Sequence, residues 1–122
     1  IMLTKNKIPF INENQNMKKA IKIINLKKLG FLVVTNSDGL TKGVFTDGDL
    51  KRLMRKKIKI DHLKIKYYMS KQPYSVEENT LASDVLYQMN KKKITNVVVY
   101  KKKNKLKTIG VIHIHDLLNN LN

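Results

Sequence analysis

Helical spacing of apolar residues occurs twice along this chain. Each set recurs at i, i+3, i+4 and i+7, which places its members on one face of an amphipathic helix. The first set is Met17, Ala20, Ile21 and Ile24, and the second set is Ala82, Val85, Leu86 and Met89. A short, mostly apolar run follows each set, at residues 31–35 and 97–100, and such runs are typical of buried strands. The pattern therefore predicts two segments in which a helix precedes a buried strand.

Turn residues and a second strand follow each predicted buried strand. Residues 36–39 read Asn-Ser-Asp-Gly, which is a strong turn sequence, and residues 103–105 are its weaker counterpart. The second strands are predicted at residues 43–45 and 108–112. Each half of the chain is therefore expected to contain a hairpin after its first helix.

An eight-residue phrase occurs twice, as GVFTDGDL at residues 43–50 and as GVIHIHDL at residues 110–117. A helix is predicted to begin at an acidic residue of each phrase, because carboxylates stabilise helix N-termini. That residue is Asp47 or Asp49 in the first phrase and Asp116 in the second. The phrase thus marks where the second strand of each half passes into a closing helix.

The two halves align over most of their length. A shift of 65 residues places Ile11 on Val76, and a shift of 67 residues places the first phrase on the second. Further upstream, Pro9 matches Pro73 to within one residue of this shift, and Met2 matches Met69 to within two. A unit of roughly fifty residues is marginal alone. We therefore predict an α+β fold of two repeats, each strand–helix–strand–strand–helix, packed about a pseudo-two-fold axis.

The repeat also predicts where the domains lie. The first repeat is expected at residues 1–57, a linker at 58–67 and the second repeat at 68–122. The linker carries four apolar residues among lysines: Ile58, Ile60, Leu63 and Ile65. Such a segment is expected to pack against a repeat rather than to stay fully solvated.

Composition narrows the class of protein. The 122 residues carry a net charge of +16, from 23 Lys, 2 Arg and 9 acidic residues. The excess of lysine comes with 13 Asn and 13 Ile, and A/T-rich codons explain all three together. A nucleic-acid reader favours arginine and interleaved aromatic residues, so nucleic-acid binding is disfavoured, although it remains an alternative. Cysteine is absent, which excludes disulfides.

No apolar run approaches the length of a membrane helix, and no signal peptide is recognisable. A cytoplasmic location without membrane contact is therefore expected. The first residue is Ile1 rather than methionine, so we expect the chain to be a piece of a longer protein.

The repeated phrase has the chemistry of a nucleotide cradle. Its first glycine allows a backbone or a ligand to approach closely. The Thr46 hydroxyl can donate and accept hydrogen bonds, and the Asp49 carboxylate can accept two from a ribose diol. A helix N-terminus beside them favours a phosphate. Alternatively, Thr46, Asp49 and Asp116 simply cap helices and contact no ligand.

The chain resembles a tandem pair of CBS domains. The resemblance rests on the order proline, amphipathic helix, apolar strand and Gly-h-h-Thr-x-x-Asp-Leu (h apolar), present twice. Residues 45–52 and 111–118, with Leu29-Gly30 and residues 93–98, are similar to the carboxy-terminal half of the sugar-phosphate isomerases that interconvert ribulose 5-phosphate and arabinose 5-phosphate.

The resemblance implies that catalysis belongs to an upstream sugar-isomerase domain with a Ser/Thr-rich loop. The four serines of this chain are scattered, so no catalytic residue and no required cofactor is expected here. The longer protein would supply arabinose 5-phosphate for Kdo, a sugar of lipopolysaccharide. This piece would be its allosteric module, binding an adenine nucleotide or CMP-Kdo in clefts between the repeats. It would also pair as a homodimer, or as a tetramer in the longer protein. The alternative is a purely structural dimerisation module with empty clefts.

The family pattern also implies the ligand-binding residues. The first site would use Thr46 and Asp49 with Leu29 and Gly30, and the second would use Asp116 with Ile94, Thr95, Asn96 and His113. His113 stands where the pattern has threonine, and Tyr67 stands where relatives often carry aspartate. A metal site of His113, His115 and Asp116 is disfavoured, because no fourth ligand is evident.

Overall fold

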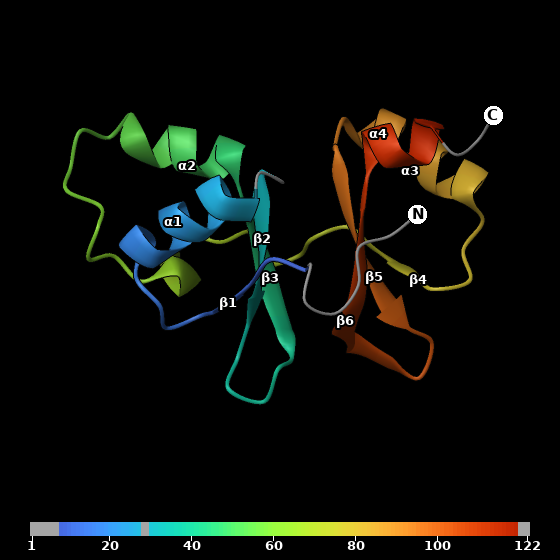
Figure 1. The fold of residues 1–122 in the computed structure, drawn as a ribbon, viewed down its shortest axis with the longest axis horizontal. Helices are drawn as coiled ribbons and strands as arrows, with labels where there is room; N and C mark the ends of the chain where they lie inside the picture. Colours follow the sequence, from blue (N-terminus) through green and yellow to red (C-terminus); the bar gives the residue numbers. More distant parts are fainter. Residues whose placement is uncertain (1–7, 28–29, 120–122) are drawn as a thin grey trace. The chain divides into compact units, whose positions relative to one another are not determined.

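The computed structural model describes residues 8–27 and 30–119 (Figure 1). The chain divides into two compact units. One unit is Pro9–Gln72, and the other is Pro73–Asn122 with Ile1–Ile8. Each unit holds the strands and helices of one repeat and has its own hydrophobic core.

The first unit is a three-stranded sheet with two helices. Its elements in chain order are β1 (Phe10–Asn12), α1 (Met17–Lys27), β2 (Phe31–Thr35), β3 (Thr41–Thr46) and α2 (Asp47–Met54). The strand order is β1-β2-β3, in which β1 runs parallel to β2 and β2 runs antiparallel to β3. The helix α1 is therefore the crossover between two parallel strands.

The second unit repeats this topology. Its elements are β4 (Ser75–Glu77), α3 (Ala82–Lys92), β5 (Asn96–Lys101), β6 (Asn104–His113) and α4 (Ile114–Asn119). The sheet order is β4-β5-β6, again with a parallel pair followed by an antiparallel pair. The predicted α+β fold and its strand–helix–strand–strand–helix repeat are confirmed.

The apolar helix faces predicted from the sequence form the cores. In the first unit, Met17, Ala20 and Ile24 of α1 are buried with Leu32 and Val34 of β2. In the second unit, Val85 and Met89 of α3 pack with apolar residues of β4, β5 and α4. Residues two apart on a strand share a face, so both helices of each unit lie on one side of its sheet (Figure 1).

The two hairpins match the prediction to different degrees. In the first, the Asn36 side chain accepts hydrogen bonds from the N–H groups of Asp38 and Leu40, and Gly39 has a φ of +79°. The predicted turn is confirmed. In the second, the turn was predicted at 103–105, but β6 already begins at Asn104. That position was wrong because backbone pairing with β5 continues through exposed polar residues, whatever their turn propensity.

The lysine-rich segment after α2 packs against the first repeat. Ile65, in the 3₁₀ turn η2 (Ile65–Tyr67), is fully buried in the first core. The backbone N–H of Met17 donates to the Leu63 carbonyl (2.7 Å), and that of Ile65 donates to the Gln15 carbonyl (3.0 Å). Ile58, in contrast, is 52% exposed. The segment is thus anchored by its second half.

Candidate functional site

The first copy of the repeated phrase forms a capping box at the start of α2. Thr46 is the N-cap residue, and its Oγ1 accepts a hydrogen bond from the Asp49 N–H (3.1 Å). In return, Asp49 Oδ2 accepts a hydrogen bond from the Thr46 N–H (2.9 Å). Two N–H groups that the helix cannot satisfy internally are thereby paired. Thr46 and Asp49 therefore cap α2 in the structure, which is one of the two roles that the sequence allowed for them.

The Asp49 carboxylate is a shared acceptor. Its side chain is 12% exposed and forms an ion pair through Oδ1 with Arg52, whose side chain is 65% exposed. The Ser70 hydroxyl donates to Oδ2 at 3.5 Å. An ionised carboxylate offers about four acceptor positions, so the partners Thr46, Ser70 and Arg52 leave room for one further donor. Neither Ser70 nor Arg52 was predicted as a site residue, because Ser70 lies outside the repeated phrase and Arg52 follows its last residue, Leu50.

The start of β2 is held against the start of α2. The Asp47 N–H donates to the Gly30 carbonyl at 2.8 Å. Gly30 has a φ of +76°, and a Cβ at this position would lie 3.2 Å from Asp47 Oδ2. Glycine tolerates both features. The structure thus brings Gly30 together with Thr46 and Asp49, whereas Leu29 lies outside the described residues.

The second repeat builds the same junction with a different cap. The Ile114 N–H donates to the Thr95 carbonyl at 2.8 Å, as Asp47 does to Gly30. His113 stands in the place of Thr46, and its Nδ1 accepts a hydrogen bond from the His115 N–H at 3.1 Å. The two imidazole rings stack at 5.0 Å. The imidazole Nδ1 thus takes over the capping function of the threonine hydroxyl oxygen.

The other predicted residues of the second repeat are placed differently. Asp116 is exposed in the first turn of α4. Asn96 Nδ2 donates to Thr95 Oγ1 (3.3 Å). Asn96 Oδ1 is buried and has no hydrogen-bond partner among the described residues. The side chain of Ile94 packs against the second core. The structure therefore gathers Thr95, Asn96 and His113 at the junction and turns Ile94 toward the core.

The glycine that opens the first phrase is explained by another backbone. Val44 and Ser70 form an antiparallel bridge with hydrogen bonds of 3.0 and 2.8 Å. A Cβ on Gly43 would collide with the Ser70 carbonyl and would crowd Met69. The close approach predicted from the sequence is confirmed here, and its partner is the chain itself.

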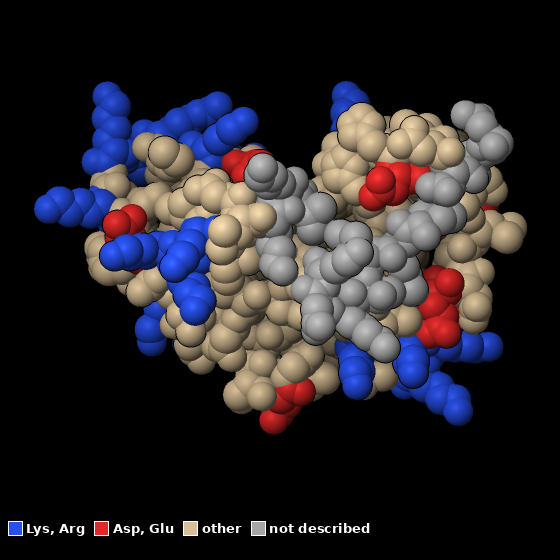
Figure 2. Space-filling model, viewed as in Figure 1, with Lys and Arg blue, Asp and Glu red and all other residues tan. Residues whose placement is uncertain are grey.

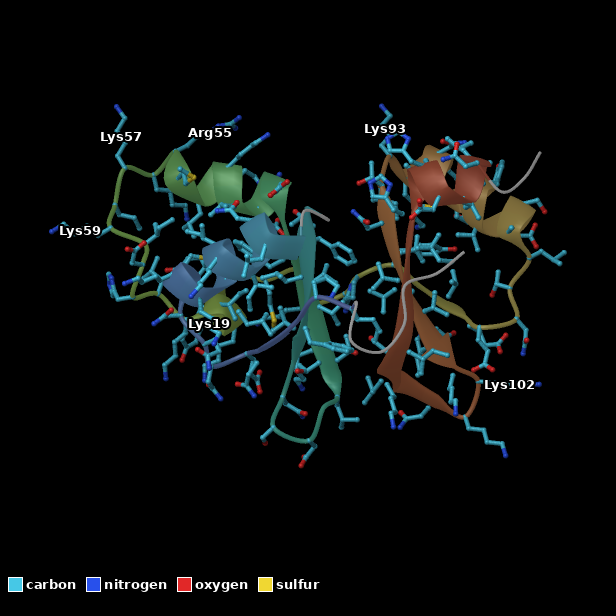
Figure 3. All side chains as sticks on the ribbon, viewed as in Figure 1. Lys19, Arg55, Lys57, Lys59, Lys93 and Lys102 are labelled. Atoms are coloured by element: carbon cyan, nitrogen blue, oxygen red, sulfur yellow. The ribbon has the colours of Figure 1, made fainter. Side chains whose placement is uncertain are left out.

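Basic side chains gather over α1, α2 and the segment that follows α2 (Figure 2). Figure 3 shows Lys57 and Lys59 pointing away from the ribbon, and both are exposed. Long charged side chains of this kind are well solvated without a partner. Within the described residues, no group of three or more His, Cys, Asp and Glu side chains is placed to hold a metal ion. None of the helices in the described part is long and apolar enough to cross a membrane.

The chain is similar in sequence to known proteins. A family model described as CBS domain matches residues 1–56 and 65–122. The chain is 35% identical over 118 residues to the arabinose 5-phosphate isomerase KdsD of Yersinia pestis, and 32% identical to that of Escherichia coli K12. Each alignment covers 97% of this chain and 35% of the relative. The chain thus spans about a third of the length of the curated relatives it matches. Both resemblances seen in the sequence are confirmed.

Solved structures share the fold. CBSX2 in complex with AMP matches with a TM-score of 0.81 at 18% identity, covering 98% of this chain and 91% of that chain. The cytosolic domain of the Mg²⁺ channel MgtE in complex with ATP matches with a TM-score of 0.77 at 16% identity, covering 96% of this chain and 46% of that chain. At these identities the likeness concerns the fold alone.

Proposed function

We propose a function for this chain from the premise that it belongs to the CBS domain family. The chain is a pair of CBS domains, and we propose that the pair senses a nucleotide and thereby regulates a sugar-phosphate isomerase domain of the same polypeptide. The curated relatives support this, because they are arabinose 5-phosphate isomerases about three times as long as the aligned region. In this proposal the isomerase chemistry belongs to the rest of the longer protein.

The junction at the start of α2 carries the proposal. There Asp49 lies in the first turn of the eight-residue helix α2 and pairs with the exposed Arg52, and the Gly30 carbonyl accepts a hydrogen bond from the Asp47 N–H of the same turn. The remaining acceptor position of Asp49 suits a ribose hydroxyl. The positive end of the α2 dipole and the Arg52 guanidinium suit a phosphate. These three contacts together describe a ribose 5′-phosphate, the part that all the candidate nucleotides share.

The second repeat offers a different set of groups. Asn96 Oδ1 is a buried acceptor without a donor among the described residues. A buried polar atom in this state calls for an explanation, and the exocyclic amino group of adenine or cytosine would supply the missing donor. His113 and Asp116 then provide an imidazole and a carboxylate where the first repeat has Thr46 and Asp49. We propose that this repeat contacts the ligand through Thr95, Asn96, His113 and Asp116.

Adenine nucleotides are the first candidates, because the structural relatives named above were solved with AMP and ATP. CMP-Kdo is the second candidate. If the longer protein supplies arabinose 5-phosphate for Kdo, this activated sugar is a late product whose binding would give feedback on an early step. Both share the ribose phosphate, and only the base and the attached sugar acid distinguish them.

Thermal unfolding of the chain with AMP, ADP, ATP, CMP or CMP-Kdo tests the proposal. A ligand at 100 times its dissociation constant stabilises by about 2.7 kcal/mol, which for a chain of this size raises the melting temperature by on the order of 10 °C. Asp49→Ala should remove the ligand-induced rise. Asp38→Ala is the matched control. This substitution removes the same charge as Asp49→Ala, but Asp38 lies in the β2–β3 turn and not at the start of α2. A flat response to all five compounds would reject the nucleotide-sensing function.

A purely structural module is the second candidate function. It is favoured by the capping box, which already gives Thr46 and Asp49 a role that needs no ligand. In this case the chain would pair with a second copy and hold the longer protein together. Sedimentation equilibrium distinguishes the two: a dimer whose dissociation constant is unchanged by nucleotides and by Asp49→Ala supports the structural role.

A further inference from the structure

The two repeats differ in what fills the space between the first strand and the first helix. In the first repeat, Ile65 is fully buried in the same cluster as Ile11, Met17 and Val34, and its N–H is bonded to Gln15, which lies between β1 and α1. The backbone on either side of Ile65 is tied down. Ile65 and Lys66 donate to the carbonyls of Gln15 and Glu13, at 3.0 and 3.1 Å. The segment after α2 thus docks one aliphatic side chain into the β1–α1 corner.

The second repeat has a pocket at the matching place. Its volume is about 290 Å³. The residues that line it are Val76, Glu77, Glu78, Thr80, Ala82, Val85, Val99, Ile112 and Leu117. In the alignment of the repeats, Val76, Ala82 and Val99 are the counterparts of Ile11, Met17 and Val34, which belong to the same buried cluster as Ile65. The second core has no counterpart of Ile65 among the described residues.

The size and the lining of this pocket favour a peptide side chain. Ligand pockets for small molecules usually measure roughly 300–1,000 Å³, so this pocket is at the lower limit. Its buried lining residues are apolar, and its more exposed lining residues include Glu77 and Glu78, which complement cations. In the first repeat the docked isoleucine is flanked by Lys64 and Lys66. An aliphatic residue between two basic residues therefore fits both the apolar lining and the two glutamates.

The start of α3 also matches a docked segment. In the first repeat, the N–H groups of Met17 and Lys18 donate to the carbonyls of Leu63 and Asp61, at 2.7 and 3.1 Å. The docked segment thereby caps α1. The N-cap residue of α3 is Leu81, which provides no side-chain cap. Carbonyl groups of a segment in the pocket would supply this missing cap.

We propose that the pocket of the second repeat is a docking site for a short peptide segment that carries an aliphatic residue between basic residues. The occupant is the stretch of polypeptide that precedes Met2 when this chain is part of a longer protein. Met2 is the counterpart of Met69, and Ile65 precedes Met69 by four residues. The same stretch in the pocket would join the second repeat to whatever domain lies before it. This inference is independent of nucleotide binding.

A synthetic peptide with the sequence of residues 60–69 is the probe. It is added to the chain labelled at its valine methyl groups, and the methyl resonances are followed by NMR. Docking should shift the methyl resonances of Val76, Val85 and Val99 in a saturable manner. The methyl resonances of Val34 should stay unchanged, because Ile65 already occupies the core of the first repeat. A peptide with Ile65→Asp should bind at least about tenfold more weakly, the factor that burial of one aliphatic side chain carries.

Two variants of the chain make the test specific. Ala82→Leu fills the pocket and should abolish the methyl shifts, and its own melting temperature shows that it folds. Ser83→Leu is the matched control, because Ser83 is exposed on the same turn of α3 and does not line the pocket. The docking proposal is overturned if no saturable shift occurs, or if Ala82→Leu binds the peptide as well as Ser83→Leu. Peptide-induced shifts of equal size in both repeats would also overturn it. Sedimentation without peptide tests whether a second copy of the chain occupies the pocket instead. A dimer that is lost in Ala82→Leu but kept in Ser83→Leu would assign the pocket to a second copy.

Discussion

Gly43→Ala tests why the repeated phrase opens with glycine. The added methyl group would collide with the Ser70 carbonyl and would lie 3.1 Å from Met69 Sδ and 3.2 Å from Met69 Cγ. The methionine side chain can move, but the carbonyl belongs to the Val44–Ser70 bridge and is fixed by its hydrogen bonds of 3.0 and 2.8 Å. The bridge must therefore open for the alanine to fit.

The size of the effect follows from the bonds that are lost. Two backbone hydrogen bonds contribute about 1–3 kcal/mol together, and forced repacking of Met69 adds about 1 kcal/mol. Against this, alanine reduces the entropy of the unfolded chain, which stabilises by about 0.4–1 kcal/mol. We therefore expect Gly43→Ala to lower the free energy of unfolding by about 2 kcal/mol.

Urea unfolding followed by circular dichroism measures this change, with Gly48→Ala as the control. A Cβ at Gly48 would lie 3.5 Å from the Arg52 guanidinium and 3.6 Å from Thr46 Oγ1, which are ordinary contacts. Because Gly48 is inside α2, alanine there should stabilise by about 0.5–1 kcal/mol. If both variants are equally stable, or if Gly43→Ala is the more stable, the close approach of Ser70 does not explain the glycine.

Three further changes have defined outcomes. Ile65→Ala should destabilise by about 2–5 kcal/mol in urea unfolding because Ile65 is fully buried, whereas the exposed Ile58→Ala should change stability by less than about 0.5 kcal/mol; similar values for both would contradict the docking of this segment. His113→Thr should preserve stability, since threonine can cap α4, and His113→Ala should cost about 1 kcal/mol; equal losses would show that the imidazole does not cap. Asn96→Val should raise stability by about 1 kcal/mol, because removing a buried acceptor without a partner gains about 1–3 kcal/mol and losing the Asn96 Nδ2–Thr95 Oγ1 hydrogen bond costs about 0.5–1.5 kcal/mol. It should also reduce the nucleotide-induced rise in melting temperature. A marked loss of stability would show that Asn96 Oδ1 has a protein partner.

The change from threonine to histidine between the two phrases has a physical explanation. A helix start needs an acceptor for its first N–H groups. Thr46 provides a hydroxyl oxygen and His113 provides Nδ1. The two side chains differ in size and polarity, but each accepts a hydrogen bond from an N–H group at a helix start.

The sequence by itself determined the repeat and the place of the site within it. Helical spacing, valine-rich runs and turn residues act over a few positions, so they specify local structure without reference to the rest of the chain. Thr46 and Asp49 were placed at a helix start for the same reason. The position of the second hairpin turn was missed because pairing with β5, rather than the residues of the turn, decides where β6 begins.

Only the tertiary structure decided which distant groups meet. Ser70 reaches Asp49 and Val44 across more than twenty residues, and Ile65 enters a core formed largely by residues 11–34. Nothing in the local pattern separates Ile65, which is buried, from Ile58, which is exposed, because both stand among lysines. Burial there depends on hydrogen bonds to Gln15 and Glu13. Such contacts exist only once the first repeat has folded, and so they leave no periodic signal in the sequence.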